Sequence, residues 1–364
     1  MKWWGIYITI MVGALVLSVA LTPICRALAW KWNFLDKPLG EGHKQHGEAT
    51  PVLGGMAMVF AWLLSIGGGL IVMYYFPKIL PNELRIAADG IKEVHERVIV
   101  IIAGGVAFWL IGLADDRKPM SAKLKLLLQV VVMGIVAQYG VQVSLFQESP
   151  VLKWILTFGW LMVILNAINF YDNMDGLLCG VAAIASFIFM VAAGIMGQYL
   201  VSILAAVTTG VTLGFYFFNQ KPASIFMGDN GSHFLGYILG ALGVMVTYYK
   251  EGDMNVTYPF LVPFLVLSLP LFDLGAVVVI RLRNKQPIYI GDHNHISHRF
   301  VKMGFSQRHA VYLIHLLSFA LGIGAIALLH SSLTVALLLL SQTAALLGFL
   351  TILHSRHKLN GKSK

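Results

Sequence analysis

Five groups of polar and charged residues interrupt an otherwise apolar sequence. In chain order they are Asp36-Lys-Pro38 with Lys44, His46 and Pro51-Val-Leu-Gly-Gly55; Leu113-Ala-Asp-Asp-Arg117 with Lys123; Asn166-Ala-Ile-Asn-Phe-Tyr-Asp-Asn-Met-Asp-Gly176; Phe226-Met-Gly-Asp-Asn-Gly-Ser232; and Arg281 with 292–299. Carboxylate and amide oxygens are ligands that Mg²⁺ prefers, and Mg²⁺ commonly bridges substrate phosphates. Lysine and arginine side chains neutralise further phosphate oxygens. These residue types therefore indicate phosphoryl transfer, in which catalysis is mostly positioning and charge stabilisation.

The third group has the spacing of a helix face. Asn166, Asn169, Asp172 and Asp175 recur every three residues, which places amides and carboxylates on one side of a helix end. An ionisable residue inside a membrane is a functional candidate by default. The alternative for Asp175 is that it only caps the following helix.

Each of the other groups also has a structural alternative. Asp115 and Asp116 could be solvated charges at a helix end, and Gly228–Ser232 could be only a turn. His295 and His298 have a spacing that zinc would accept, but no cysteine or helical His-Glu-x-x-His motif accompanies them, which argues against zinc.

The amino-acid composition indicates whether these polar groups belong to a soluble protein or to a membrane protein. The chain has 364 residues, of which 58% are hydrophobic and 12% charged, whereas soluble domains are about 45–50% apolar and about 25% charged. The net charge of +9 fits cytoplasmic loops facing an anionic leaflet, so no nucleic-acid partner is expected. Cys25 and Cys179 lie in apolar stretches and give no disulfide framework. The sequence therefore predicts an all-α, polytopic integral membrane protein.

Charge-free intervals predict the spans, because a spanning helix needs about 20 apolar residues. These intervals are 3–25, 49–77, 98–114, 126–147, 154–171, 176–220, 230–249, 254–272 and 309–355. Two of them are long enough for a pair of helices, with turns at Gly194–Gln198 and His330–Ser332, so about eleven spans are expected in a single domain, 1–364. The first interval is too long for a signal-peptide core and should remain as a helix.

Lysine and arginine predict the orientation. The loops after odd-numbered spans and the C-terminal tail hold 18 of these residues, and the N-terminus with the other loops holds 7. We therefore expect the N-terminus outside and the C-terminus inside. All five polar groups then lie on cytoplasmic loops, and a site at a membrane face suggests a lipid substrate.

The five ordered motifs resemble those of the polyprenyl-phosphate N-acetylhexosamine 1-phosphate transferases (glycosyltransferase family 4), a superfamily that includes the peptidoglycan translocase. The resemblance extends from Asp36 to Arg299, and eleven spans are typical of its N-acetylglucosamine branch. It implies transfer of N-acetylglucosamine 1-phosphate from UDP-N-acetylglucosamine to undecaprenyl phosphate, with release of UMP. It also implies a bacterial inner-membrane location, an active site facing the cytoplasm, and a homodimer as one expectation.

Other substrates and classes remain open at this point. The same reaction could use another UDP-N-acetylhexosamine or UDP-N-acetylmuramoyl-pentapeptide. A transporter is the alternative of a different class, but transporters place ionisable groups near the bilayer midplane, often in repeated halves. Here the charges gather at one face without a repeat.

The resemblance also assigns roles to residues. Asp229 and Asn169 would hold Mg²⁺, with Mn²⁺ as a substitute. The residues implied at the reacting groups are Asp115, Asp116, Asp172, His295 and His298. Those implied in substrate binding are Lys44, His46, Arg117, Lys123, Asn166, Asp175 and Arg299.

The last motif departs from the family pattern, which is His-x-His-His-Arg. Here Ser297 replaces the middle histidine, and a serine hydroxyl can donate a hydrogen bond but cannot become cationic. We expect His293 to supply the missing charge. No dedicated general base is required, because the second pKa of a phosphate monoester is near ~6 and the lipid nucleophile is already ionised.

Overall fold

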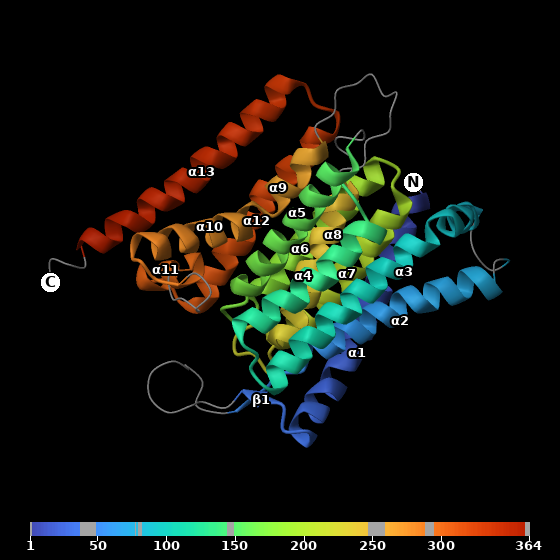
Figure 1. Ribbon diagram of the computed structural model, residues 1–364, viewed down its shortest axis with the longest axis horizontal. Helices are drawn as coiled ribbons and strands as arrows, with labels where there is room; N and C mark the ends of the chain where they lie inside the picture. The colour runs from blue at the N-terminus through green and yellow to red at the C-terminus, as the bar shows by residue number, and fades with distance from the viewer. Residues whose placement is uncertain are drawn as a thin grey trace.

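The computed structural model is almost entirely helical, as the sequence predicts (Figure 1). It describes residues 2–36, 49–76, 78, 82–143, 149–246, 259–287 and 295–360. The helices are α1 (Lys2–Lys31), α2 (Gly54–Tyr75), α3 (Asn82–Arg117), α4 (Ala122–Tyr139), α5 (Pro150–Tyr171), α6 (Leu177–Ile195), α7 (Tyr199–Asn219), α8 (Gly228–Val246), α9 (Val262–Val266), α10 (Ser268–Arg283), α11 (Ile296–Lys302), α12 (Gln307–Ala327) and α13 (Leu333–Asn360), with 3₁₀ turns at Pro259–Leu261 (η1) and Leu328–His330 (η2).

Nine helices within these described ranges are long and apolar enough to cross a membrane. The two long charge-free intervals each form a pair of helices, and the turns between them lie where predicted, at Gly194–Gln198 and His330–Ser332. The other two predicted spans correspond to α8 and to α9 with α10. The first turns of α8 are polar, and α10 is only 16 residues long. A polytopic membrane protein is thus confirmed, while the count of eleven and the orientation stay predictions.

Helix α8 forms the centre of the bundle. It packs against α2, α3, α5 and α6, and almost every residue from Asn230 to Val246 is buried. Glycines on α8 allow this packing: a Cβ added at Gly236 would lie 2.9 Å from the Cα of Leu165 on α5. The polar residues at the start of α8 are therefore enclosed by neighbouring helices.

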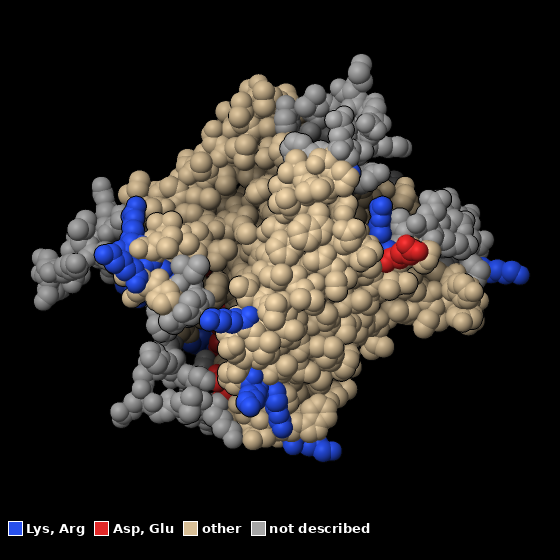
Figure 2. All heavy atoms as spheres, viewed as in Figure 1, with Lys and Arg blue, Asp and Glu red and all other residues tan. Residues whose placement is uncertain are grey.

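The outer helices present apolar side chains to their surroundings. In α1 and α13 only 22% and 11% of the most apolar stretch is buried inside the protein, and α13 runs along the edge of the bundle (Figure 1). The face in Figure 2 has a broad surface without charged side chains, and lysines and arginines lie toward its margins. This arrangement suits a lipid environment.

A short two-stranded antiparallel sheet, β1 (Leu35–Asp36) and β2 (Thr50–Pro51), follows α1. Its second strand is tied to the segment before α8, because Phe226 donates its backbone N–H to Pro51 O at 2.8 Å. Gly54 and Gly55 at the start of α2 donate in turn to the carbonyls of Phe226 and Met227, at 3.0 and 2.9 Å. The first and fourth motifs are thus joined by backbone hydrogen bonds.

Candidate active site

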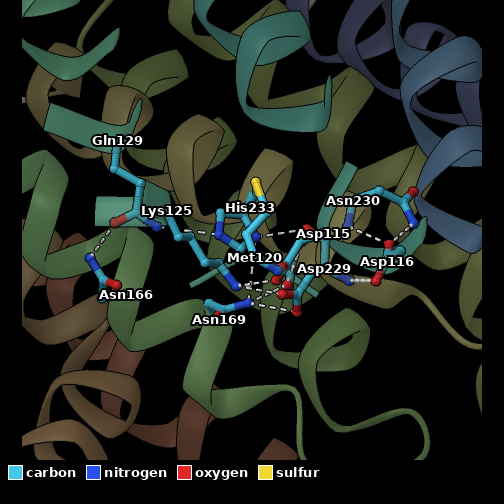
Figure 3. A network of polar contacts seen from close by, with 11 residues as sticks. Asp115, Asp116, Met120, Lys125, Gln129, Asn166, Asn169, Asp229, Asn230 and His233 are labelled. Atoms are coloured by element: carbon cyan, nitrogen blue, oxygen red, sulfur yellow. Dashed lines mark hydrogen bonds and ion pairs between the residues drawn. The ribbon is translucent and has the colours of Figure 1, made fainter. Parts of the chain in front are cut away.

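Four helix ends meet to form a group of polar side chains that we call the carboxylate–lysine cluster: Asp115, Lys125, Asn169 and Asp229 (Figure 3). Helices α3 and α5 end here, and α4 and α8 begin here. The Nζ of Lys125 lies 2.9 Å from Asp115 Oδ2 and 2.5 Å from Asp229 Oδ2. Asn169 donates through Nδ2 to Asp229 Oδ1 at 3.1 Å and to Ser232 Oγ at 2.8 Å.

Asp115 also fixes the turn that leads to Lys125. Its Oδ1 accepts the backbone N–H of Met120 at 2.6 Å. Ser121 then caps α4, and its side chain accepts from Leu124 N. Lys125 therefore enters the cluster one turn into a helix whose start is fixed by Asp115 itself.

Asp116, unlike Asp115, binds backbone N–H groups at the start of a helix. Its carboxylate accepts the backbone N–H groups of Asp229 and Asn230 at 2.9 Å each, and the side-chain amide of Asn230 at 2.6 Å. The first N–H groups of a helix lack partners within the helix, and a negative charge there is favourable. Asp116 on α3 thus caps α8 from another helix.

Two glycines make this cap sterically feasible. Gly228 has φ +73°, and a Cβ there would lie 2.6 Å from Asp116 Oδ2. A Cβ at Gly112 on α3 would lie 2.2 Å from Asp229 O. Both positions need glycine because α3 and the first turn of α8 approach so closely.

Asp172 follows the last residue of α5 at the same end of the bundle. Burial, together with the nearby negative charges of Asp229, Asp116 and Asp175, raises the pKa of Asp172 to about 7. Asp175 accepts the backbone N–H of Ala223 at 3.2 Å. The N-cap position of α6 is Gly176, without a capping side chain, so the alternative of Asp175 as that cap is not what the structure shows.

The histidine motif starts α11 and is held by an aspartate on α10. The side chains of His295 and Asp273 are 5% and 2% exposed, and His295 Nδ1 lies 2.7 Å from Asp273 Oδ2. Asp273 Oδ1 accepts the N–H of Ile296 at 2.7 Å. His298 is half-buried, with its ring centroid 6.5 Å from that of His295.

Ser297 connects this motif to the end of α5. It is fully buried, and its hydroxyl donates to Asn173 Oδ1 at 2.5 Å. The segment from Asn169 to Asn173 therefore contacts the carboxylate–lysine cluster at one end and α11 at the other. The hydroxyl group of Ser297 is therefore hydrogen-bonded within the protein and not directed at a phosphate or sugar. Replacing Ser297 by histidine would remove this hydrogen bond.

The remaining predicted site residues lie in different places. Arg117 donates to Trp32 O at 3.0 Å and stacks over Phe34 with 4.8 Å to the ring centroid, so it holds the end of α1. Lys123 is exposed. Asn166 lies one turn from Asn169, and half-buried Arg299 follows His298 on α11. Lys44, His46 and His293 lie outside the described residues.

Sequence reasoning missed several residues that the structure brings to the site. Lys125 rather than Lys123 reaches the carboxylates, because positions two apart on a helix face nearly opposite sides. A signal was available: Lys125 and Gln129 are an i, i+4 polar pair within an otherwise apolar stretch. His233 and Asp273 gave no comparable signal, whereas Asn230 lies within the fourth motif but was assigned no role.

The donor set of the cluster fits Mg²⁺. Asp115 and Asp229 place carboxylate oxygens within reach of one cationic group. Asn169 faces Asp229 with its NH₂ group, so its amide oxygen would hold the ion only after the amide turns over. Mg²⁺ needs only one or two carboxylates and keeps several waters. Within the described ranges, no three His, Cys, Asp or Glu side chains are grouped closely enough to hold a metal alone, so the zinc alternative finds no third ligand there.

A separate cavity of about 520 Å³ lies at the other end of the same helices. Its walls include Gly140 at the end of α4, Tyr199 at the start of α7 and Val244 near the end of α8. None of the predicted site residues lines it. This cavity is therefore separate from the candidate active site.

An apolar helical bundle with carboxylates, an amide and a lysine gathered at one end fits a membrane-embedded transferase. The family model described as glycosyl transferase family 4 matches residues 98–247, which hold the second, third and fourth motifs. Together with the relatives described next, this match shows that the chain belongs to glycosyl transferase family 4 and confirms the superfamily that the motifs predict.

Curated relatives extend the match over most of the chain. A probable undecaprenyl-phosphate N-acetylglucosaminyl 1-phosphate transferase of Bacillus subtilis is 32% identical over 336 residues, covering 90% of this chain and 86% of the relative. A decaprenyl-phosphate N-acetylglucosaminephosphotransferase of Mycolicibacterium smegmatis is 28% identical, covering 83% and 77%. A phospho-N-acetylmuramoyl-pentapeptide-transferase of Bacillus licheniformis is 31% identical, covering 66% and 75%. A glycosyl-1-phosphate transferase of the membrane is thereby supported.

Proposed function

We propose that this protein transfers N-acetylglucosamine 1-phosphate from UDP-N-acetylglucosamine to undecaprenyl phosphate and releases UMP. The lipid-linked sugar would start a cell-envelope polysaccharide. The observation that carries the proposal is the convergence of Asp115, Lys125, Asn169 and Asp229 at one end of an apolar bundle. There a lipid phosphate in the membrane and a water-soluble nucleotide can meet.

The choice of sugar rests on the relatives. The Bacillus subtilis and Mycolicibacterium smegmatis proteins are named for N-acetylglucosamine, and they match 90% and 83% of the chain. The relative named for N-acetylmuramoyl-pentapeptide matches 66%. The excess of lysine and arginine in the loops at the end that holds the cluster favours a cytoplasmic site in a bacterial inner membrane.

The chemistry is an exchange of one P–O bond for another. An oxygen of the lipid phosphate attacks the sugar-bearing phosphorus of the UDP-sugar, and the bond from that phosphorus to the oxygen bridging to UMP breaks. The electron pair leaves with UMP. The C1–O bond of the sugar is untouched, so its anomeric configuration is retained.

The residues of the chain position and neutralise the reacting groups. Lys125 binds phosphate oxygens, and Asp115 holds the lysine in place. Asp229 and Asn169 would hold Mg²⁺, which when bound neutralises the diphosphate. The lipid phosphate is ionised near neutral pH, since its second pKa is near ~6, so no aspartate has to remove a proton.

The test is a reconstituted assay. Purified protein in lipid nanodiscs receives undecaprenyl phosphate, Mg²⁺ and one of three radiolabelled donors: UDP-N-acetylglucosamine, UDP-N-acetylgalactosamine or UDP-N-acetylmuramoyl-pentapeptide. We expect labelled lipid and stoichiometric UMP with the first donor, and none with the Asp229→Asn variant. Label in lipid only with another donor would overturn the sugar assignment. In a parallel reconstitution into sealed vesicles, donor uptake without UMP release would instead indicate transport.

A further inference from the structure

A second group of polar side chains lies one helical turn deeper in the bundle than the carboxylate–lysine cluster, beside it in Figure 3. We call it the polar layer: Gln129, Asn166 and His233. Each member shares a helix with one member of the cluster. The pairs are Lys125 with Gln129 on α4, Asp229 with His233 on α8, and Asn169 with Asn166 on α5. The offset is i+4 on the two helices that begin at the site and i−3 on the helix that ends there, so all three lie deeper in the bundle.

Hydrogen bonds join the polar layer into a chain across the three helices. Asn166 Nδ2 donates to Gln129 Oε1 at 3.4 Å, and Gln129 Nε2 lies 3.3 Å from His233 Nε2. His233 Nδ1 lies 2.8 Å from Asp229 O. His233 and Gln129 are 0% and 2% exposed, so these bonds have little competition from water.

Both ends of the chain are backbone carbonyls, and this fixes the direction of every bond. Asn166 must present its NH₂ group, because it also donates to Met162 O at 2.8 Å. Gln129 therefore accepts through Oε1 and donates through Nε2, and His233 accepts at Nε2. The proton of a neutral His233 then sits on Nδ1 and is donated to Asp229 O. The 3.5 Å approach of Asn169 Nδ2 to His233 Nδ1 brings two donors together and is not a bond.

We infer that the polar layer is a positioning device for the transferase site, an inference that rests on the proposed function. Helices in lipid associate without a hydrophobic driving force, so interhelical hydrogen bonds act together with close packing to define their relative depth. The layer sets the depth of α4, α5 and α8, and thereby brings Lys125, Asn169 and Asp229 to one point. His233, Gln129 and Asn166 touch no reacting atom, and they act through their partners in the cluster.

Two substitutions of His233 separate this role from simple stability. A glutamine at this position places its amide where Nε2 lies, so His233→Gln keeps an acceptor for Gln129. His233→Asn reaches only the Nδ1 position, keeps the contact within α8 and loses the bond to α4. We expect His233→Gln to resemble the wild type. We expect His233→Asn to raise the Mg²⁺ concentration for half-maximal turnover about tenfold, since losing a buried bond to the layer weakens the alignment of the cluster.

Gln129→Leu tests the partner of His233, and Gln138→Leu provides the matched control. Gln129→Leu should be at least as harmful as His233→Asn, because it removes the bond to His233 and also the acceptor for Asn166. The double variant should be no worse than Gln129→Leu, because the bond between the two residues is already lost. Gln138→Leu makes the same chemical change on an exposed position of α4 and should leave the Mg²⁺ dependence unchanged.

A readout that needs no turnover is the rise in Tm caused by Mg²⁺ alone. We expect it to be normal for His233→Gln and reduced for His233→Asn and Gln129→Leu, even if the donor sugar proves to be a different one. The inference is overturned if His233→Gln and His233→Asn behave alike, if the two single effects add, or if Tm falls without any change in the Mg²⁺ dependence.

Discussion

The carboxylate of Asp116 accepts the backbone N–H of Asp229 at 2.9 Å, although the two residues are 113 positions apart. The neighbouring Asp115 instead contacts Lys125. Two adjacent aspartates of one motif therefore have different structural roles. Asp116 caps the helix that carries Asp229, and Asp115 forms an ion pair with Lys125.

This division predicts different results for one substitution made at two neighbouring positions. Asp116→Asn places an amide NH₂ against N–H donors at the start of α8, so we expect a destabilisation of about 1–3 kcal/mol, visible as a lower Tm. Asp115→Asn keeps an acceptor for Met120 and should leave Tm nearly unchanged, with turnover reduced by about 10²-fold. Thermal unfolding and turnover of both detergent-solubilised variants provide the check. If both variants lowered Tm equally, Asp115 and Asp116 would contribute equally to stability, and this division of roles would be wrong.

Lys125 and Lys123 lie on the same helix, so replacing each by alanine gives two comparable variants. Lys125→Ala removes the cation between Asp115 and Asp229, and we expect turnover to fall by about 10²–10³-fold. Lys123 is exposed, so Lys123→Ala should change turnover by less than about twofold. Steady-state kinetics with both substrates measures the two effects. A larger loss at position 123 would contradict the geometry of the site.

Asp229→Asn should abolish transfer while the protein still folds. Its carboxylate is one of few anionic groups available to Mg²⁺, so losing it weakens metal binding. We expect turnover to drop by about 10³-fold at ordinary Mg²⁺ and to recover only in part at high Mg²⁺. Glu96→Gln, which removes an exposed carboxylate, is the control. Near-normal turnover of Asp229→Asn would refute the metal assignment.

The raised pKa of Asp172 predicts a pH-dependent stability. The folded protein keeps this proton up to about pH 7, whereas an unfolded aspartate loses it near ~3.9. The folded state therefore binds more protons between these values, and its stability falls as the pH rises from about 4 to 7. Asp172→Asn removes this loss, so the Tm of the variant relative to wild type should be higher at pH 8 than at pH 5.5. The scans are made with a chelator, and a difference that does not grow with pH would contradict the shift.

The orientation can be tested at the two ends of α12. Lys302 and Ser332 are exposed on either side of this helix, and Cys25 and Cys179 are buried. We expect Lys302→Cys to react with a membrane-impermeant maleimide only after permeabilisation, and Ser332→Cys to react from outside. Labelling of both from the same side would contradict the topology.

Much of the architecture followed from the local sequence. A span depends on the summed hydropathy of about 20 consecutive residues, and the turns at Gly194–Gln198 and His330–Ser332 are visible as breaks in that pattern. Local hydropathy is a weaker guide for α8, whose polar first turns are enclosed by other helices, and for α10, which is short. Their place in the bundle depends on packing.

The sequence alone determined that this protein is a helical membrane protein, and it predicted that the polar motifs carry phosphate chemistry, because composition and residue type are local properties. The tertiary structure decided which side chains meet. Lys125 contacts Asp229 across 104 positions, and His295 contacts Asp273 across 22. Such pairs depend on the rotation and depth of helices that pack against one another. A change of two positions along α4 turns a side chain from the site toward the surroundings, which is why Lys125, and not Lys123, lies between the carboxylates.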